Sequence, residues 1–178
     1  MLREARRRAE SSQRATIFGY HVEDPRAYGV IEMDSDGQVL SIEEKPGHPR
    51  SHWAATGLYF YDDRVCDFAR RVKRSHRGEY EITDLNQLYC DEGALDVERL
   101  GRGYARLDTG THDLLLEASE FVRSIQHRQG MQIACLEEIA WTQGWIDRSL
   151  LLDSAKRYEK TRYGMYLSAL ADLPVSAI

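Results

Sequence analysis

Short apolar runs rich in β-branched and aromatic residues recur through the first hundred positions of the chain. Such runs, bounded by polar and turn-forming residues, predict β-strands. An Asp-Ser-Asp-Gly sequence at 34–37 predicts a hairpin turn between two of them. The run AATGLYFY is almost continuously apolar, which is typical of a strand in the middle of a covered sheet. Strands are predicted at residues 15–22, 28–34, 38–45, 54–61, 95–101 and 104–107.

Apolar residues at helical spacing alternate with these strands. Asp62 or Asp63 is predicted to cap a first helix, and Gly93 to end a second helix at 82–92. The clearest helix begins at Thr111 and ends at Gly130. Its apolar stripe repeats every 3.6 residues and consists of Leu114, Leu115, Ala118, Phe121, Val122 and Ile125.

Beyond residue 136 the chain is predicted to be helical almost to its end, with breaks near Gly144 and Gly164. The mixture of strands and helices followed by a helical tail predicts an α/β fold with a carboxyl-terminal helical extension. We divide it into a short helix at 1–14, an α/β part at 15–130 and the extension at 131–178. A short helix followed at once by a strongly apolar strand indicates sheet partners upstream of Met1.

The chain has 178 residues and a formal net charge of −5, which argues against binding nucleic acid through a broad basic surface. Three widely spaced cysteines without a CxxC motif favour reduced thiols in the cytoplasm over disulfides or zinc. No apolar run has the roughly 20 residues that a membrane helix needs. The charged amino terminus is unlike a secretory signal. We therefore expect no nucleic-acid or membrane partner.

Charged side chains gather at the carboxyl end of the predicted strand at 38–45, in the sequence Ile42-Glu-Glu-Lys-Pro46. In open α/β sheets, ligands bind at such strand ends. A carboxylate there can accept hydrogen bonds from sugar hydroxyls, and a neighbouring ammonium can hold a phosphate. The alternative is a solvated strand end.

Three further motifs have a functional and a structural interpretation. Asp108, in LDTGT, is a hard oxygen ligand suited to magnesium, or simply part of a strand-to-helix turn. Arg77, in RGEYE, suits phosphate recognition, or forms surface salt bridges. Gly57, inside an apolar strand, marks close approach of a ligand or backbone, or core packing. The residues alone leave these alternatives open.

The same motifs, taken in order, resemble one family. The stretches ATIFGYHVEDPRAYGVIEMDSDGQVLSIEEKP, WAATGLYFYD, RGEYEITDLNQLY, LGRGYARLDTGTHDLLLEAS and IACLEEIAW are similar to the glucose-1-phosphate thymidylyltransferases. The resemblance implies a Rossmann-like nucleotidyltransferase fold with a mixed sheet. It also implies magnesium-assisted formation of dTDP-glucose and pyrophosphate from dTTP and glucose 1-phosphate, in the cytoplasm, for rhamnose and surface-polysaccharide synthesis. Members are usually homotetramers.

The resemblance also implies roles for particular residues. Glu44 would hold glucose hydroxyls, Lys45 and Arg77 the sugar phosphate, and Asp108 one magnesium ion. Weaker matches to the family's feedback site for dTDP-rhamnose are Gly101, Arg102, Glu138 and Ile139. The implied sugar-phosphate site consists of Gly29, Glu44, Lys45, Ala55, Tyr59 and Arg77.

The chain departs from the family pattern in two respects. It contains neither the GGxGTRLxP loop that grips the triphosphate nor the GDN aspartate that supplies a second magnesium ligand. Arg106 stands where the family usually has an aromatic residue, just before LDTGT. We therefore expect a truncated enzyme that is inactive alone and has exposed strand edges. It is either the product of a truncated gene or a half completed by a separate amino-terminal chain, and we expect it to form a homo-oligomer or to pair with that chain. Alternatives are a non-catalytic sugar-nucleotide-binding or regulatory fragment, or a sister enzyme for another sugar or base.

Overall fold

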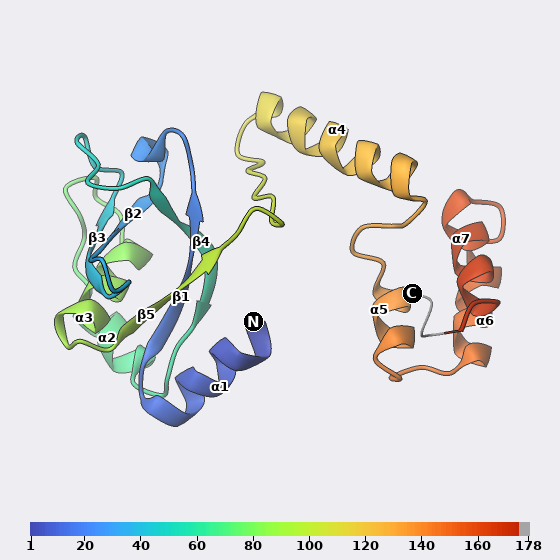
Figure 1. The fold of residues 1–178 in the computed structure, drawn as a ribbon, viewed down its shortest axis with the longest axis horizontal. Helices are drawn as coiled ribbons and strands as arrows, with labels where there is room; N and C mark the ends of the chain where they lie inside the picture. Colours follow the sequence, from blue (N-terminus) through green and yellow to red (C-terminus); the bar gives the residue numbers. More distant parts are fainter. Residues whose placement is uncertain (175–178) are drawn as a thin grey trace. The chain divides into compact units, whose positions relative to one another are not determined.

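The computed structural model describes residues 1–174, so the end of the predicted helical extension, 175–178, lies outside the described part. The chain forms two compact units, Met1–Arg106 and Leu107–Ile178. The first contains a five-stranded sheet and the second is helical (Figure 1). Each unit is described by itself.

The sheet of the first unit is mixed, as predicted. Its strands lie in the order β3-β2-β4-β1-β5. The β1–β5 pair is parallel, and the other neighbouring pairs are antiparallel. The strands are β1 (Ala15–His21), β2 (Gly29–Met33), β3 (Val39–Glu44), β4 (Trp53–Phe60) and β5 (Leu95–Leu100), with a short 3-10 helix, η1 (Pro25–Ala27), before β2.

Helices cover the sheet because alternate strand residues are apolar on both faces. Ile17 and its same-face neighbours pack under α2 (Val65–Arg71) and α3 (Ile82–Asp91), which contribute the buried rings of Phe68 and Tyr89. Phe18 points the other way, and α1 (Leu2–Ser12), with Ala5 and Ala9 buried, lies against β1 and β4 (Figure 1). The core thus fixes the strand ends on which the candidate site is built.

The hairpin of β2 and β3 departs from strict side-chain alternation at one point. Strict alternation places Leu40 with Ile42 and Val39 with Ser41. The register shifts between Glu32 and Met33, so Met33 pairs with Val39 and leaves Leu40 without a partner. Val39 therefore packs against the core, whereas Leu40 is 54% exposed. A bulge of this kind reverses the faces of a strand, and sequence periodicity does not reveal it.

Strand β4 is paired unequally on its two sides. It pairs with β1 from Trp53 to Phe60, with a bulge opposite Phe18. On the other side, the register with β2 consists of Val30 with Ala54 among the residues described. The β4 edge beyond Ala54 is therefore open within residues 1–174, in line with the expected exposed strand edges.

The second unit is built of helices, as predicted. They are α4 (His112–Gln129), α5 (Leu136–Thr142), α6 (Arg148–Arg157) and α7 (Arg162–Ala171). The Thr111 hydroxyl accepts a hydrogen bond from the Leu114 N–H, and Gly130 ends α4 at φ 70°, as the sequence predicts. In residues 1–174, no helix is both long and apolar enough to cross a membrane.

Two predictions of local structure are wrong. Residues 104–107 form no strand; Tyr104 donates its N–H to the Gly101 carbonyl in a turn instead. Neither Asp62 nor Asp63 caps α2, because its capping position is Arg64, which makes no side-chain capping bond. The predicted helix break near Gly164 is confirmed at residues 158–161, between α6 and α7, and Gly164 itself lies in the first turn of α7. A Cβ at position 164 would lie 2.1 Å from the Tyr158 carbonyl oxygen, so glycine is required there for packing.

Candidate functional site

The predicted sugar-phosphate residues of β2 and β3 lie side by side. Gly29, the first residue of β2, pairs with Glu44, the last residue of β3. The next residue, Lys45, donates its N–H to the Tyr28 carbonyl at 2.9 Å. The hairpin thus brings one carboxylate and one ammonium to the same edge of the sheet.

Glu44 is held in place by α3. The buried Thr83 donates its hydroxyl hydrogen bond to Oε2 of Glu44. Gly29 leaves room for this contact, since a Cβ at position 29 would lie 2.9 Å from Thr83 Oγ1 and 3.2 Å from Glu44 Oε2. The second carboxylate oxygen, Oε1, is not engaged by Thr83 and lies towards two cations.

Those cations are Lys45 and Arg77. Lys45 Nζ lies 4.0 Å and Arg77 Nη1 3.9 Å from Glu44 Oε1. Arg77 is also held by carboxylates of its own loop, at 3.1 Å from both Glu79 and Glu81. Arg77 therefore forms salt bridges within its loop and also lies beside the candidate site.

Lys45 has a strained backbone. Its φ is +45°, although a residue before proline, here Pro46, normally adopts an extended conformation. Positive φ is uncommon for residues other than glycine and costs of the order of 1 kcal/mol or more. The turn it makes directs the chain away from β3 at the point where the charged side chains gather.

Burial and nearby negative charge both perturb a neighbouring carboxyl group, Asp84. Burial raises the pKa of Asp84 above its usual value, and the carboxylates of Glu81 and Glu44 raise it further. A nearby anionic ligand would raise it again, whereas bound cations would lower it. The carboxylates of Glu44 and Glu81 therefore lie close enough to Asp84 to act on it.

Strand β4 supplies the remaining predicted residues. The Cβ that Gly29 lacks would lie 3.7 Å from the Cβ of Ala55, which places Ala55 beside the hairpin. Burial raises the pKa of the Tyr59 phenol, the carboxylate of Glu44 raises it further, and the charge of Arg106 lowers it. The six predicted sugar-phosphate residues thus gather in the first unit.

This arrangement can bind a polyol that carries a phosphate. A carboxylate accepts hydrogen bonds from hydroxyl groups, and the two cations beside it match an anionic group a few ångströms away. The described residues supply no nucleophile or paired general acid and base here. The chemistry of this half-site is therefore recognition and positioning.

Asp108 belongs to the second unit, in the turn before α4. Its Oδ1 accepts hydrogen bonds from the N–H groups of Thr109 at 2.7 Å and Gly110 at 3.1 Å. The turn interpretation of LDTGT is thus correct, and a carboxylate oriented in this way still has lone pairs for a hard cation. Within residues 1–174, no group of three or more His, Cys, Asp or Glu side chains is arranged to hold a metal. Asp108 would be one ligand of a site completed by substrate oxygens, water or further protein groups.

The four predicted feedback-site residues fall in different units. Gly101 and Arg102 line a cavity of about 540 Å³ with aromatic residues that include His21, Trp53 and Tyr104. In the second unit, Glu138 accepts a hydrogen bond from the Tyr166 hydroxyl at 2.7 Å, and Ile139 is 44% exposed. Their roles stay predictions.

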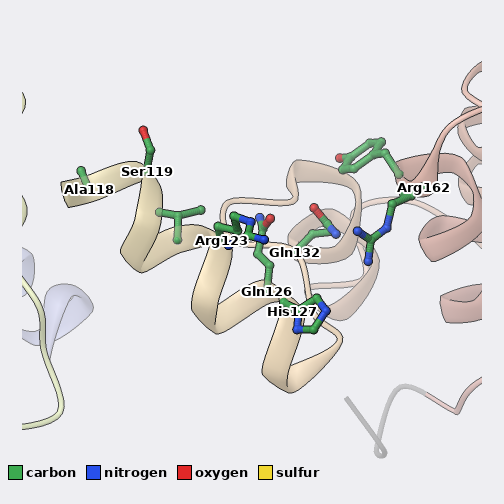
Figure 2. A pocket seen from close by; sticks show the side chains of 9 residues that line it. Ala118, Ser119, Arg123, Gln126, His127, Gln132 and Arg162 are labelled. Carbon is green, nitrogen blue, oxygen red and sulfur yellow. The ribbon is translucent and has the colours of Figure 1, made fainter. Parts of the chain in front are cut away.

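A larger cavity, of about 760 Å³, lies in the second unit, and the sequence did not single out its residues. Three basic side chains from two helices, Arg123, His127 and Arg162, line it together with the amides of Gln126 and Gln132 (Figure 2). All three basic residues are exposed, so the cavity is an open, positively charged hollow.

Sequence reasoning missed Thr83, which orients Glu44. A signal was present: Thr83 and Asn86 are polar residues at helical spacing on the face of α3 that also carries Leu85 and Tyr89. Buried polar groups on an apolar helix face usually have a partner. The partner of Thr83 is Glu44, 39 positions away, which the sequence alone does not show.

Comparisons with known proteins show the family and the fold. A sequence family described as nucleotidyl transferase matches residues 1–125, which include the whole sheet and the candidate site. The chain belongs to this nucleotidyl transferase family. Its predicted α/β fold and its resemblance to sugar nucleotidyltransferases are therefore confirmed.

The nucleotidyl transferase relatives include several named glucose-1-phosphate thymidylyltransferase. Those of Xanthomonas campestris and Mycolicibacterium smegmatis are 57% and 54% identical over 166 residues, which is 93% of this chain. That of Neisseria gonorrhoeae is 53% identical over 159 residues, or 89% of the chain. The matched region spans 55–58% of these relatives' own lengths, so the chain corresponds to little more than half of each.

Two solved structures share the fold. A Bacillus anthracis protein described as a glucose-1-phosphate thymidylyltransferase, solved with a sucrose, has a TM-score of 0.56 and 36% identity, covering 63% of this chain and 44% of that one. A UDP-glucose pyrophosphorylase complexed with UDP-glucose has the same TM-score at 22% identity, covering 63% and 45%. The second likeness supports the fold alone.

Proposed function

We propose that this chain provides the sugar-phosphate-binding half of a glucose-1-phosphate thymidylyltransferase. The observation that carries the proposal is the carboxylate of Glu44, fixed by Thr83 and flanked by Lys45 and Arg77. The same combination suits a hexose 1-phosphate, because hydroxyls and phosphate are presented together. The names of relatives at 53–57% identity support dTTP and glucose 1-phosphate as the substrates and dTDP-glucose as the product.

Each residue has a role in this proposal. Glu44 accepts hydrogen bonds from glucose hydroxyls, and Gly29 lets the ligand or Glu44 approach the backbone. Lys45 and Arg77 hold the phosphate, whose oxygen would attack the α-phosphate of the nucleotide. Ala55 and Tyr59 form the wall of the sugar pocket. Reactions of this type depend on positioning and charge neutralisation more than on covalent catalysis.

Magnesium is part of the proposal, with Asp108 as one of its ligands. A bound magnesium ion would neutralise charge on the reacting phosphates and the departing pyrophosphate. Asp108 lies in the second unit and Glu44 in the first, so the metal and sugar roles are separate hypotheses. The three cysteines are unpaired, which is compatible with the cytoplasmic, polysaccharide-forming pathway that we propose.

We further propose that the chain has little or no turnover by itself. The triphosphate-gripping loop GGxGTRLxP does not occur in its sequence, and transition-state charge would be poorly stabilised without such groups. Activity would require an amino-terminal segment of the family, within a homo-oligomer or as a separate chain. A non-catalytic sugar-nucleotide-binding or regulatory role is the second candidate, favoured by the same half-site without that loop. A sister enzyme for another sugar or base is the third.

Two assays test the proposal. Glucose 1-phosphate should shift the NMR signals of the 178-residue chain, and Glu44→Gln should weaken this binding about tenfold or more, as expected for losing charge-assisted hydrogen bonds. The matched control is Glu43→Gln, because Glu43 is the exposed neighbour on β3. Equal binding by the two variants would contradict the assigned site.

Pyrophosphate release separates the enzymatic role from the binding role. The chain is incubated with glucose 1-phosphate, dTTP and magnesium, with and without the amino-terminal half of a relative. Turnover only in the complemented reaction is expected. If neither reaction releases pyrophosphate but the chain still binds the sugar phosphate, the non-catalytic role is favoured. Turnover by the chain alone would refute the dependence on a further segment.

A further inference from the structure

Arg106 lies beside the candidate sugar-phosphate site. Its guanidinium carbon is 4.5 Å from the centre of the Tyr28 ring. Tyr28 precedes Gly29, and its carbonyl accepts the Lys45 N–H at 2.9 Å. Arg106 is half-buried although it lies outside any helix or strand. The stacked guanidinium is therefore placed against the hairpin end that carries Gly29 and Glu44.

A second observation brings Arg106 to the sugar pocket. Burial raises the pKa of the Tyr59 phenol, and two opposing charges also act on it: the carboxylate of Glu44 raises this pKa further and the guanidinium of Arg106 lowers it. A charge shifts the pKa of a neighbouring group when it lies within a few ångströms of that group. Tyr59 thus lies within reach of both Glu44 and Arg106.

The site contains cations in two different places. Lys45 and Arg77 both approach the same carboxylate oxygen, Oε1 of Glu44. Arg106 instead stacks on the aromatic ring of Tyr28, and its charge acts on the phenol of Tyr59. A guanidinium over an aromatic ring keeps N–H donors at its edge, and its five donors can serve more than one partner.

We infer that Arg106 is a further ligand-binding cation, and that the pocket accepts a hexose 1-phosphate carrying a second acidic group, such as a carboxylate, on the sugar. This rests on the proposed function, because it assigns the phosphate to Lys45 and Arg77 and the second acid to Arg106. The residue therefore sets which sugar phosphates the site prefers.

The inference is tested by comparing two ligands on the full 178-residue chain. Dissociation constants for glucose 1-phosphate and glucuronic acid 1-phosphate are measured by NMR titration. We expect the carboxylate-bearing ligand to bind about five- to tenfold more tightly, as for a bidentate charge-assisted pair. Arg106→Gln and Arg106→Trp should abolish this preference while leaving glucose 1-phosphate binding within about twofold, and Arg106→Lys should keep part of it.

Arg70→Gln is the matched control, because Arg70 is an exposed arginine of α2 that pairs with Asp67. Near-ultraviolet circular dichroism verifies that each variant is folded, and the tryptophan variant preserves packing on Tyr28 if the glutamine variant does not fold. If the Arg106 variants lose affinity for both ligands equally, Arg106 holds the phosphate that the two ligands share. An unchanged ratio would show that it merely covers Tyr28. Either result overturns the inference and leaves the proposed function intact, whereas no binding of either ligand to the folded chain overturns both.

Discussion

Thr83 donates a hydrogen bond to Glu44 from 39 positions further along the chain, and so fixes the carboxylate at the end of β3. The donor is 2% exposed, and the acceptor is half-buried. A carboxylate held in this way loses little freedom when it binds a sugar, which favours affinity. Helix α3 is therefore part of the candidate site, although it carries none of the residues that the family resemblance assigns.

Replacing Thr83 by valine should weaken glucose 1-phosphate binding about tenfold, because a hydrogen bond to a charged group is worth about 1.5–3 kcal/mol. Thr83→Ser keeps the hydroxyl and should bind within about threefold of the original chain. NMR titration of both variants gives the comparison. Equal binding by the valine and serine variants would mean that Glu44 needs no orientation by α3.

Gly29→Ala should be destabilising, since the new methyl would lie 2.9 Å from Thr83 Oγ1 and 3.2 Å from Glu44 Oε2. Overpacking of this kind costs about 1–3 kcal/mol. Gly57→Ala is the steric control, because a Cβ at position 57 has no atom within 4 Å in the described structure. Urea unfolding measures both free energies. If both substitutions lower the free energy of unfolding equally, the close packing at Gly29 is contradicted.

Gly164→Ala should disrupt the contact between α6 and α7, where a Cβ would lie 2.1 Å from the Tyr158 carbonyl oxygen. The obstacle is backbone, so the helices must separate, and a loss of about 3 kcal/mol or more is expected for the second unit. Ser168→Ala changes an exposed residue of the same helix and should leave stability within about 0.5 kcal/mol. Thermal unfolding followed by circular dichroism tests this. A melting temperature unaltered by Gly164→Ala would refute the tight packing.

Asp62 should make the first unit sensitive to acid. The residue is 8% exposed and accepts hydrogen bonds from the Tyr89 hydroxyl at 2.8 Å and the Arg64 side chain at 2.9 Å. Burial by itself raises the pKa of Asp62, but the hydrogen bonds from Arg64 and Tyr89 outweigh it and bring the pKa below its ordinary value of 3.8.

Because the folded pKa is the lower one, the stabilisation is complete above the unfolded pKa and disappears as the pH falls through the folded pKa. The free energy of unfolding of the original chain should therefore fall between about pH 5 and pH 2. Asp62→Asn should flatten this dependence, whereas Asp63→Asn, at the exposed neighbour, should preserve it. The free energy of unfolding of both variants, measured as a function of pH, tests this. The same pH dependence in both variants would contradict the role assigned to Asp62.

The sequence predicts much of the fold because its signals are local. Thr111 caps α4 and Gly130 ends it, and both effects arise within one helical turn. The bulge at Leu40 is different: it depends on the register between β2 and β3, which is set by the partner strand. The tight approach at Gly164 likewise depends on where α6 ends relative to α7. Neither feature can be derived from the spacing of apolar residues.

In the candidate site, too, the features carried by local motifs were predicted, whereas contacts between distant residues were not. The resemblance supplied Glu44, Lys45 and Arg77 because it operates on motifs, and the structure brings these side chains together. The hydrogen bond of Thr83 to Glu44 and the stacking of Arg106 on Tyr28 were not predicted, because each contact joins residues that are far apart in the sequence. The contacts that orient and tune a site are thus harder to predict than the groups that bind.

During synthesis on the ribosome, β1 emerges long before the strand that completes its hydrogen bonding, since Ala15 pairs with Leu95. The β2–β3 hairpin, with Gly29 opposite Glu44, can close early because its loop is short. A nascent chain that has not yet reached residue 100 therefore exposes an unpaired β1 edge, which is a hazard for intermolecular strand pairing. The last strand of the sheet governs the pace of folding and the interval over which the growing chain depends on protection from aggregation.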